Sequence, residues 1–145
     1  MNRSPVGIGI MASGSGSNAE ALLAACADGR LNAKGVLVVS NLADAGVHQV
    51  ASGFGVPCRT IRRDDFGSGK LFADTLIDAF RAAGTDLICL AGYMRKVPPD
   101  LIRAFPKAIL NIHPALLPRH GGKGLYGIRV HEAVIEAGDR ETGVT

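Results

Sequence analysis

The stretch VGIGIMASGSGSNAEALLAACA, residues 6–27, contains the pattern that predicts the fold. An apolar run at residues 6–11 predicts a buried strand, and a loop of glycines and serines follows it. A helix is predicted at residues 19–27, closed near Gly29. A strand, a Gly-rich loop and a helix in this order are typical of an α/β fold with a parallel sheet.

The same alternation continues along the sequence. Further strands are predicted at residues 35–39, 56–61, 87–91 and 108–112, and helices at residues 43–53, 70–83, 98–105 and 130–137. Residues 62–69 and 119–127 are predicted loops, and residues 143–145 indicate the beginning of another strand. This order predicts an open, mostly parallel Rossmann-like sheet with helices on both faces. Residues 1–145 are expected to form a single α/β domain, because no repeat or linker divides them.

Composition excludes several classes of protein. The 145 residues are 47% hydrophobic and 20% charged, which is typical of a globular domain. The net charge of +3 comes from basic residues spread along the chain, and only 5% of residues are aromatic, so no nucleic-acid surface is predicted. The three cysteines and four histidines show no metal-ligand spacing, so we expect reduced thiols and no metal. No apolar run is long enough to cross a membrane, and a cytoplasmic location is expected.

The loop Ser-Gly-Ser-Gly-Ser-Asn, residues 13–18, is the first candidate site. Its glycines allow close approach of a ligand, and the free N–H groups and dipole at the following helix start favour an anion. Ser17 and Asn18 add side-chain donors. The alternative is a tight turn in which a serine or asparagine caps the helix without a ligand. The loop alone leaves both interpretations open.

Residues 14–19 also match the dinucleotide fingerprint Gly-x-Gly-x-x-Gly/Ala. That fingerprint requires an acidic residue about 20 positions later, at the end of the second strand, to hold the ribose. The second predicted strand ends instead in Ser40-Asn41, and Asp44 is better placed to open the next helix. A single phosphate requires only the loop, so it is favoured over a dinucleotide.

A second candidate follows the strand predicted at residues 87–91. Gly92 permits a sharp exit from the sheet, Met94 offers a soft apolar contact for a flat ring, and Arg95 and Lys96 are cationic. Taken alone, this segment favours an ordinary strand-to-helix loop.

The third candidate is the pair Asn111 and His113 at the end of the strand predicted at residues 108–112. Side chains alternate along a strand, so both are expected on the same side, and Pro114 ends the strand. An amide donor and an imidazole can polarise a carbonyl and move a proton, and ligands of open α/β sheets bind at the carboxyl ends of strands. For this pair alone, a strand end with ordinary hydrogen bonds is the simpler alternative.

Two other histidines are weaker candidates. His120 lies in the Gly-rich loop at residues 119–127, which could close over a substrate or be an ordinary surface loop. His131 is expected on the helix that follows. A strand end holds neither of them, so His113 is preferred.

The motif Asn-Ile-His-Pro-Ala-Leu-Leu-Pro, residues 111–118, resembles the signature of the formyltransferases that use 10-formyltetrahydrofolate, above all those that act on glycinamide ribonucleotide. The resemblance runs from the first strand to Thr145. It implies a Rossmann-like formyltransferase fold. It also implies transfer of a formyl group from 10-formyltetrahydrofolate, the co-substrate, to the amine of glycinamide ribonucleotide in purine biosynthesis, without a metal.

The resemblance also implies roles for particular residues. Those expected to bind the substrate phosphate are Ser15, Gly16, Ser17 and Asn18, and those expected to bind the folate are Lys70, Met94, Arg95, Lys96, Val97 and Asn111. Asn111 and His113 are the expected catalytic residues. Asn111 would stabilise negative charge on the formyl oxygen, and His113 would move a proton from the attacking amine.

Two departures from the family pattern lead to further expectations. The family has a third catalytic member, an Asp, roughly ten residues beyond Thr145. The chain is therefore expected to be truncated and to have little activity alone, and Asp139 is not expected to replace the missing group. The family often has an Arg that meets the folate at the position of Gly69, and Lys70 is the expected substitute.

Three alternatives stay open from the sequence. Methionyl-tRNA formyltransferases resemble the chain around residues 116–119 and 141–145, and formyltetrahydrofolate deformylases share its core but carry an extra regulatory domain ahead of it. A non-catalytic nucleotide-binding module would use only the loop at residues 13–18. The expected partners are the two small-molecule substrates, without nucleic acid or a membrane, and with a homodimer as an open option.

Overall fold

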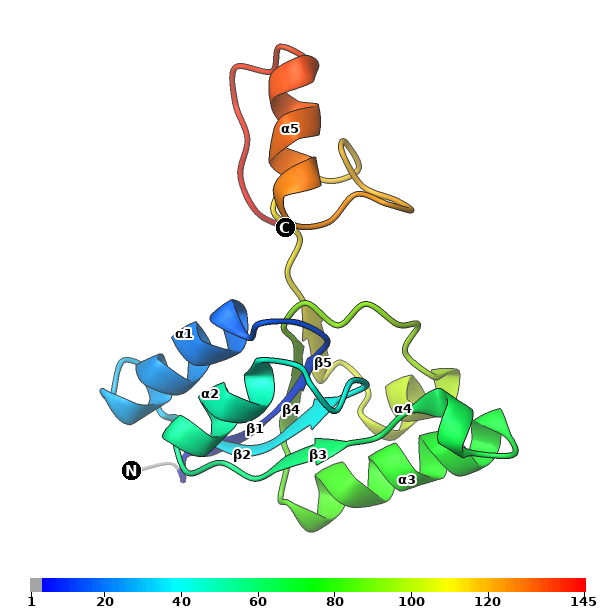
Figure 1. The fold of residues 1–145 in the computed structure, drawn as a ribbon. Coiled ribbons are helices and arrows are strands. Elements are labelled where there is room, and N and C mark those ends of the chain that lie inside the picture. The colour runs from blue at the N-terminus through cyan, green and yellow to red at the C-terminus, as the bar shows by residue number, and fades with distance from the viewer. Residues whose placement is uncertain (1–3) are drawn as a thin grey trace. The chain divides into compact units, whose positions relative to one another are not determined.

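The computed structural model describes residues 4–145 (Figure 1). The chain forms two compact units, Met1–Leu110 and Asn111–Thr145, called here the first and the second unit. Each unit contains buried apolar clusters of its own. Among the described residues, no helix is both long and apolar enough to cross a membrane.

A five-stranded sheet organises the first unit. Its strands are β1 (Val6–Ala12), β2 (Ala33–Ser40), β3 (Cys58–Thr60), β4 (Leu87–Leu90) and β5 (Ile109–Asn111), in the order β3-β2-β1-β4-β5. β1 pairs in parallel with both β2 and β4, and β2 pairs in parallel with β3. The central position of β1 agrees with its sequence, because every residue after Val6 in this strand is buried.

Helices cover both faces of the sheet (Figure 1). They are α1 (Ser17–Ala27) and α2 (Val47–Gly53) on one face, and α3 (Gly69–Ala82) and α4 (Pro99–Ala104) on the other. Side chains of β1 alternate between these layers: Ile8 and Ile10 pack with the α1 and α2 cluster, and Met11 packs with the α3 cluster. The predicted open, parallel α/β sheet with helices on both faces is therefore confirmed.

Two glycines of β1 allow α3 and the segment after it to pack closely against the strand. A Cβ atom on Gly9 would lie 2.6 Å from the ring of Phe80, and one on Gly7 would lie 2.1 Å from the carbonyl oxygen of Gly84. The Gly7 N–H also donates to Asp86 Oδ2 at 2.8 Å. These approaches are possible only without a side chain.

The second unit is built around α5 (Ile128–Glu136). Its buried cluster contains Ala115, Val130 and Val134, with Leu125 packed against it. His113 and Thr145 exchange two backbone hydrogen bonds, of 2.8 and 2.9 Å. The Thr145 hydroxyl donates to the Ala115 carbonyl and accepts from the Leu117 N–H. These contacts join the two ends of the unit.

The structure corrects the predicted start of the second helix. α2 begins at Val47, four residues later than expected. The Leu42 N–H donates to Ser40 Oγ, and a Cβ atom on Gly46 would lie only 3.0 Å from the Ser15 carbonyl oxygen. These contacts hold the preceding residues in a turn. The predicted loop at residues 62–69 likewise contains one short 3₁₀ helix, η1 (Arg63–Asp65).

Two expectations near the end of the chain also need correction. β5 ends at Asn111, so His113 lies beyond the strand and the alternation argument does not place its side chain. The structure assigns no strand to residues 143–145, where only Thr145 pairs with a neighbour, His113.

The close packing of β1 leads to a stability prediction. Gly9→Ala should lower the free energy of unfolding by about 1–3 kcal/mol, because its methyl group would overlap the Phe80 ring. The control is Gly53→Ala at the end of α2, where a Cβ atom meets nothing within 4 Å and should stabilise the chain by about 0.4–1 kcal/mol. Urea denaturation measures both. Equal unfolding midpoints for the two variants would contradict the packing described here.

Candidate functional site

Ser13, directly after β1, ties three loops of the first unit together. Its hydroxyl donates to Asn41 Oδ1, after β2, and accepts the Met94 N–H at 2.8 Å. Its own N–H donates to the Gly92 carbonyl, after β4, at 3.1 Å. The predicted anion-binding loop at residues 13–18, called here the anion loop, and the predicted cationic loop at residues 91–97 are therefore neighbours. Both lie at the carboxyl ends of their strands.

The anion loop is also packed against the start of α2. Gly16 has a φ of 87°, and a Cβ atom there would lie 2.9 Å from Val47. The Val47 N–H donates to the Gly14 carbonyl at 3.2 Å. Only glycine combines this backbone conformation with this close approach.

α1 begins at Ser17, two residues before the predicted start, with Gly16 as its N-cap. Glycine provides no side-chain cap, and the first amides of a helix have no acceptor within the helix. Ser15, Ser17 and Asn18 are exposed around these amides. The loop thus offers the N–H groups, hydroxyls and positive dipole end that bind an anion.

A cleft of about 750 Å³ lies in the first unit. Its walls come from the segments after β2, β3 and β4 and from the starts of α3 and α4, and its lining residues include Asn41, Arg62, Arg63, Phe72, Tyr93, Arg95, Lys96, Val97 and Asp100. Four side chains of the lining are cationic and two are carboxylates, Asp64 and Asp100. Burial raises the pKa of Tyr93, so its phenol stays neutral at physiological pH.

Some of the cleft's charges are already paired. Arg62 donates to Asp65 at 2.7 Å, and Asp100 pairs with Arg103. The Arg63 guanidinium donates to the Phe66 carbonyl at 2.9 Å, so its positive charge is not neutralised by that contact. Arg95 and Lys96 are exposed, and the cleft therefore favours an anionic ligand.

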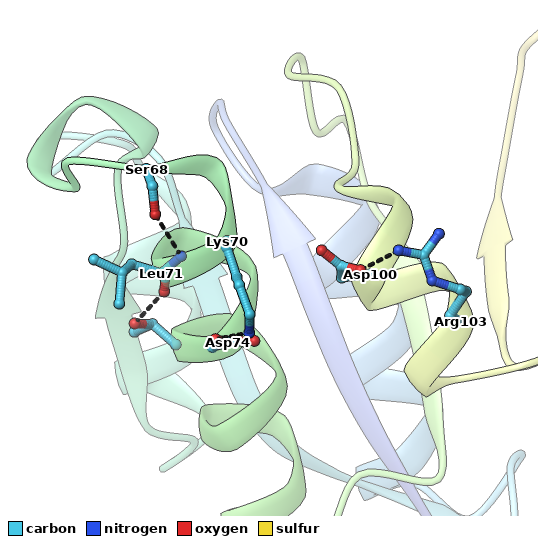
Figure 2. Close-up of polar contacts among 7 residues, drawn as sticks. Ser68, Lys70, Leu71, Asp74, Asp100 and Arg103 are labelled. Atoms are coloured by element: carbon cyan, nitrogen blue, oxygen red, sulfur yellow. Dashed lines mark hydrogen bonds and ion pairs between the residues drawn. The ribbon is translucent and has the colours of Figure 1, made fainter.

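The structure brings only some of the predicted folate residues into the cleft lining. Arg95, Lys96 and Val97 line it, whereas Met94 lies outside the lining and is 49% exposed. Lys70 also lies outside the lining, and its Nζ pairs with Asp74 Oδ2 one turn along α3 at 2.7 Å, as Figure 2 shows. Gly69 lines the cleft, and the Arg63 guanidinium lies 3.8 Å from the position that its Cβ would occupy.

The predicted catalytic residues fall in the second unit, whose first residue, Asn111, is also the last residue of β5. Asn111 is exposed, and His113 is half-buried with its Nε2 2.8 Å from the His120 carbonyl oxygen. A carbonyl can only accept, so Nε2 is assigned as the protonated nitrogen and Nδ1 carries the lone pair. The loop at residues 13–18 belongs to the first unit.

An acidic side chain of the second unit, Asp139, contacts the loop that holds His120. Asp139 accepts hydrogen bonds from His120 Nε2, at 2.7 Å, and from Arg119. The hydrogen bond from His120, together with the charge of Arg119, holds the pKa of Asp139 below its usual value. His131 is exposed on α5, as the sequence predicts.

Sequence reasoning passed over several of these residues. Arg62 and Arg63 could have been noticed as two cations directly after a predicted strand, the same signal that identified Arg95 and Lys96. The contact between His120 and Asp139 has no such signal, because 19 residues separate them. Residues 4–145 contain no group of three His, Cys, Asp or Glu side chains arranged to hold a metal ion.

Comparisons with known proteins identify the family of the chain. The family described as Formyl transferase matches residues 7–145. The chain is 45% identical to a chloroplastic phosphoribosylglycinamide formyltransferase of Arabidopsis thaliana, over 95% of this chain and 48% of that protein. It is 37% identical to a phosphoribosylglycinamide formyltransferase of Haemophilus influenzae, over 95% of this chain and 63% of that protein.

The fold is also shared with solved structures. Glycinamide ribonucleotide transformylase 1 from Symbiobacterium toebii superposes with a TM-score of 0.89 and 36% identity, over 99% of this chain and 66% of that chain. The chain thus spans between 48% and 66% of the lengths of these three proteins. The family match extends over nearly all of the described residues. The chain therefore belongs to the formyl transferase family.

Proposed function

We propose that the protein transfers a formyl group from 10-formyltetrahydrofolate to the amine of glycinamide ribonucleotide, a step of purine biosynthesis. The observation that carries this proposal is the hydrogen bonding of Ser13 in the anion loop. Ser13 bonds to Asn41 and to the loop at residues 91–97, and both of these contribute to the lining of the cationic cleft. Two curated relatives of the chain are named phosphoribosylglycinamide formyltransferase, which supports the same reaction.

Each substrate has a matching set of residues in the first unit. The phosphate of the ribonucleotide fits the exposed donors at residues 15–18 and the start of α1. The folate has a flat apolar ring system and an anionic tail. The cleft combines apolar walls, Phe72 and Val97, with the cations Arg63 and Arg95, which suits such a molecule.

Asn111 and His113 would carry the chemistry. As the amine attacks the formyl carbon, negative charge develops on the formyl oxygen, where the Asn111 amide is the proposed donor. Losing one such donor lowers the rate by roughly 100- to 1000-fold. The Nδ1 lone pair of His113 would accept the proton that the amine gives up and pass it towards the departing folate nitrogen.

The exposed donors at residues 15–18 favour a phosphorylated small substrate over a tRNA. A homodimer stays an open expectation. A cytoplasmic location also stays a prediction, since one curated relative is named as chloroplastic.

The first functional prediction concerns His113. In the protein purified from its native gene, His113→Ala should lower kcat for formyl transfer by about 100- to 10,000-fold, because the proton would have no acceptor. The dissociation constant of glycinamide ribonucleotide should change less than about threefold, because the phosphate site is unaltered. Folate release in the presence and absence of the ribonucleotide measures the reaction, and calorimetry measures binding.

The control is His131→Ala, which removes an exposed imidazole from α5 and should keep wild-type kcat. Folate release that does not depend on the ribonucleotide would contradict the proposal and point to a deformylase. Nucleotide binding without any folate binding would instead support a non-catalytic module.

The second functional prediction concerns the phosphate site. Asn18→Asp keeps the size of the side chain but places a negative charge in the first turn of α1, where the phosphate is proposed to bind. Repulsion between the two charges should weaken binding of glycinamide ribonucleotide by about 10- to 100-fold. Calorimetry on the 145-residue chain measures this change.

Gln49→Glu makes the matching change on the exposed side of α2 and should leave the affinity unaltered. If Asn18→Asp and Gln49→Glu weaken binding equally, the ligand responds only to net charge, and residues 15–18 are not the phosphate site.

A further inference from the structure

His120 links two parts of the second unit through two different atoms. Its ring Nε2 lies 2.7 Å from Asp139 Oδ2, and its backbone carbonyl oxygen lies 2.8 Å from His113 Nε2. The side chain and the carbonyl belong to one residue. A shift of the Asp139 carboxylate would therefore move the His120 carbonyl oxygen, which accepts the hydrogen bond from the His113 ring.

The backbone of His120 needs such a contact. Its φ is 54°, in the left-handed region that residues with a side chain rarely adopt. Gly121 and Gly122 follow it, and glycines restrain the backbone least. A strained conformation persists only where neighbouring contacts hold it. The bond between the His120 ring and Asp139 is such a contact.

Asp139 is well suited to act as the fixed end of this link. It follows Gly138 at the end of α5, and its N–H donates to the carbonyl of the buried Val134 at 3.3 Å. Its side chain is only 10% exposed. Arg119 contacts the other carboxylate oxygen, so the carboxylate is held between two donors of the same loop.

The contact between Asp139 and His120 determines which ring nitrogen of His113 can accept a proton. With Nε2–H bonded to the carbonyl of residue 120, Nδ1 keeps its lone pair and the ring plane is fixed. If the carbonyl moves away, the ring can rotate and exchange its proton between the two nitrogens. The fraction of molecules with a correctly directed Nδ1 lone pair then falls.

We propose that Asp139 is a positioning residue for His113, and that it acts through the His120 ring and the His120 carbonyl. The value of this arrangement for catalysis rests on the proposed function, but the arrangement itself does not. Asp139 touches neither His113 nor, in this proposal, any substrate.

The test is nuclear magnetic resonance of the 145-residue chain with ¹⁵N-labelled histidine. In the wild-type chain, His113 should show a protonated Nε2, an unprotonated Nδ1 and an Nε2 proton that exchanges slowly with water. Asp139→Ala should accelerate that exchange by about tenfold, the effect of losing a hydrogen bond of ordinary strength. The matched control Glu136→Ala removes an exposed carboxylate from the end of α5 and should leave the exchange rate unchanged.

The methyl signals of Val130 and Val134 report whether the second unit stays folded. Native methyl signals together with an unchanged exchange rate in Asp139→Ala would overturn the proposal. If those signals are lost, His120→Phe replaces Asp139→Ala as the deciding variant, because it keeps the carbonyl and an aromatic ring but removes both ring nitrogens, including the Nε2 that meets Asp139. Faster exchange in His120→Phe supports the link, and wild-type exchange overturns it.

Activity provides an independent measurement. In an active protein purified from its native gene, Asp139→Ala should lower kcat by about tenfold and leave KM for both substrates within about twofold. The double variant with His120→Phe should be no slower than either single variant, because both break one link. If the wild-type protein transfers no formyl group, the proposed function fails, whereas the exchange measurement still decides the role of Asp139.

Discussion

The hydroxyl of Ser13 is the contact on which the arrangement of the first unit's candidate residues depends. It is buried, donates to Asn41 after β2 and accepts from Met94 after β4. Removing it would leave a buried carbonyl oxygen and a backbone N–H without their partner, which typically costs about 1–3 kcal/mol for each buried group. The sheet order places the loops after β2, β1 and β4 side by side, and the short polar side chain of Ser13 links them.

Close backbone packing and charge complete this arrangement. Gly16 lets the anion loop lie against Val47, and Ser17 and Asn18 at the start of α1 are exposed to solvent. In the cleft, Arg62 is paired with Asp65 and Asp100 is paired with Arg103. Arg63, Arg95 and Lys96 form no ion pair with a carboxylate among residues 4–145. Two candidate sites for negative groups thus adjoin, which is what the proposed reaction of a phosphorylated amine with a folate would need.

Local sequence patterns were sufficient for most of the fold. The apolar run of β1 and the helical spacing of Leu76, Ile77 and Phe80 in α3 each reflect burial along one element, so they could be recognised from sequence. The start of α2 was not recognised, and the residue before it, Gly46, packs closely against Ser15, which is far away in sequence.

Local patterns also identified some of the site residues, whereas residues that depend on contacts with distant parts of the sequence were missed. The loop at residues 13–18 and the cations after β4 follow strand ends, where α/β folds bind ligands. The roles of Ser13 and of the His120–Asp139 pair depend on partners 28 and 19 residues away, and no periodic pattern records such contacts. The contact of Lys70 with the folate stays a prediction, and its exposed ammonium group pairs with Asp74 on the same helix.

Ser13 links the anion loop to the loops that line the cationic cleft, and we infer that the two form one binding site. Calorimetric titration of Ser13→Ala with glycinamide ribonucleotide and, separately, with a stable formyl-folate analogue tests it most directly. Both dissociation constants should rise together, by about tenfold, while the chain stays folded. Unchanged affinities for both ligands, or a loss confined to one of them, would show that Ser13 does not join the two.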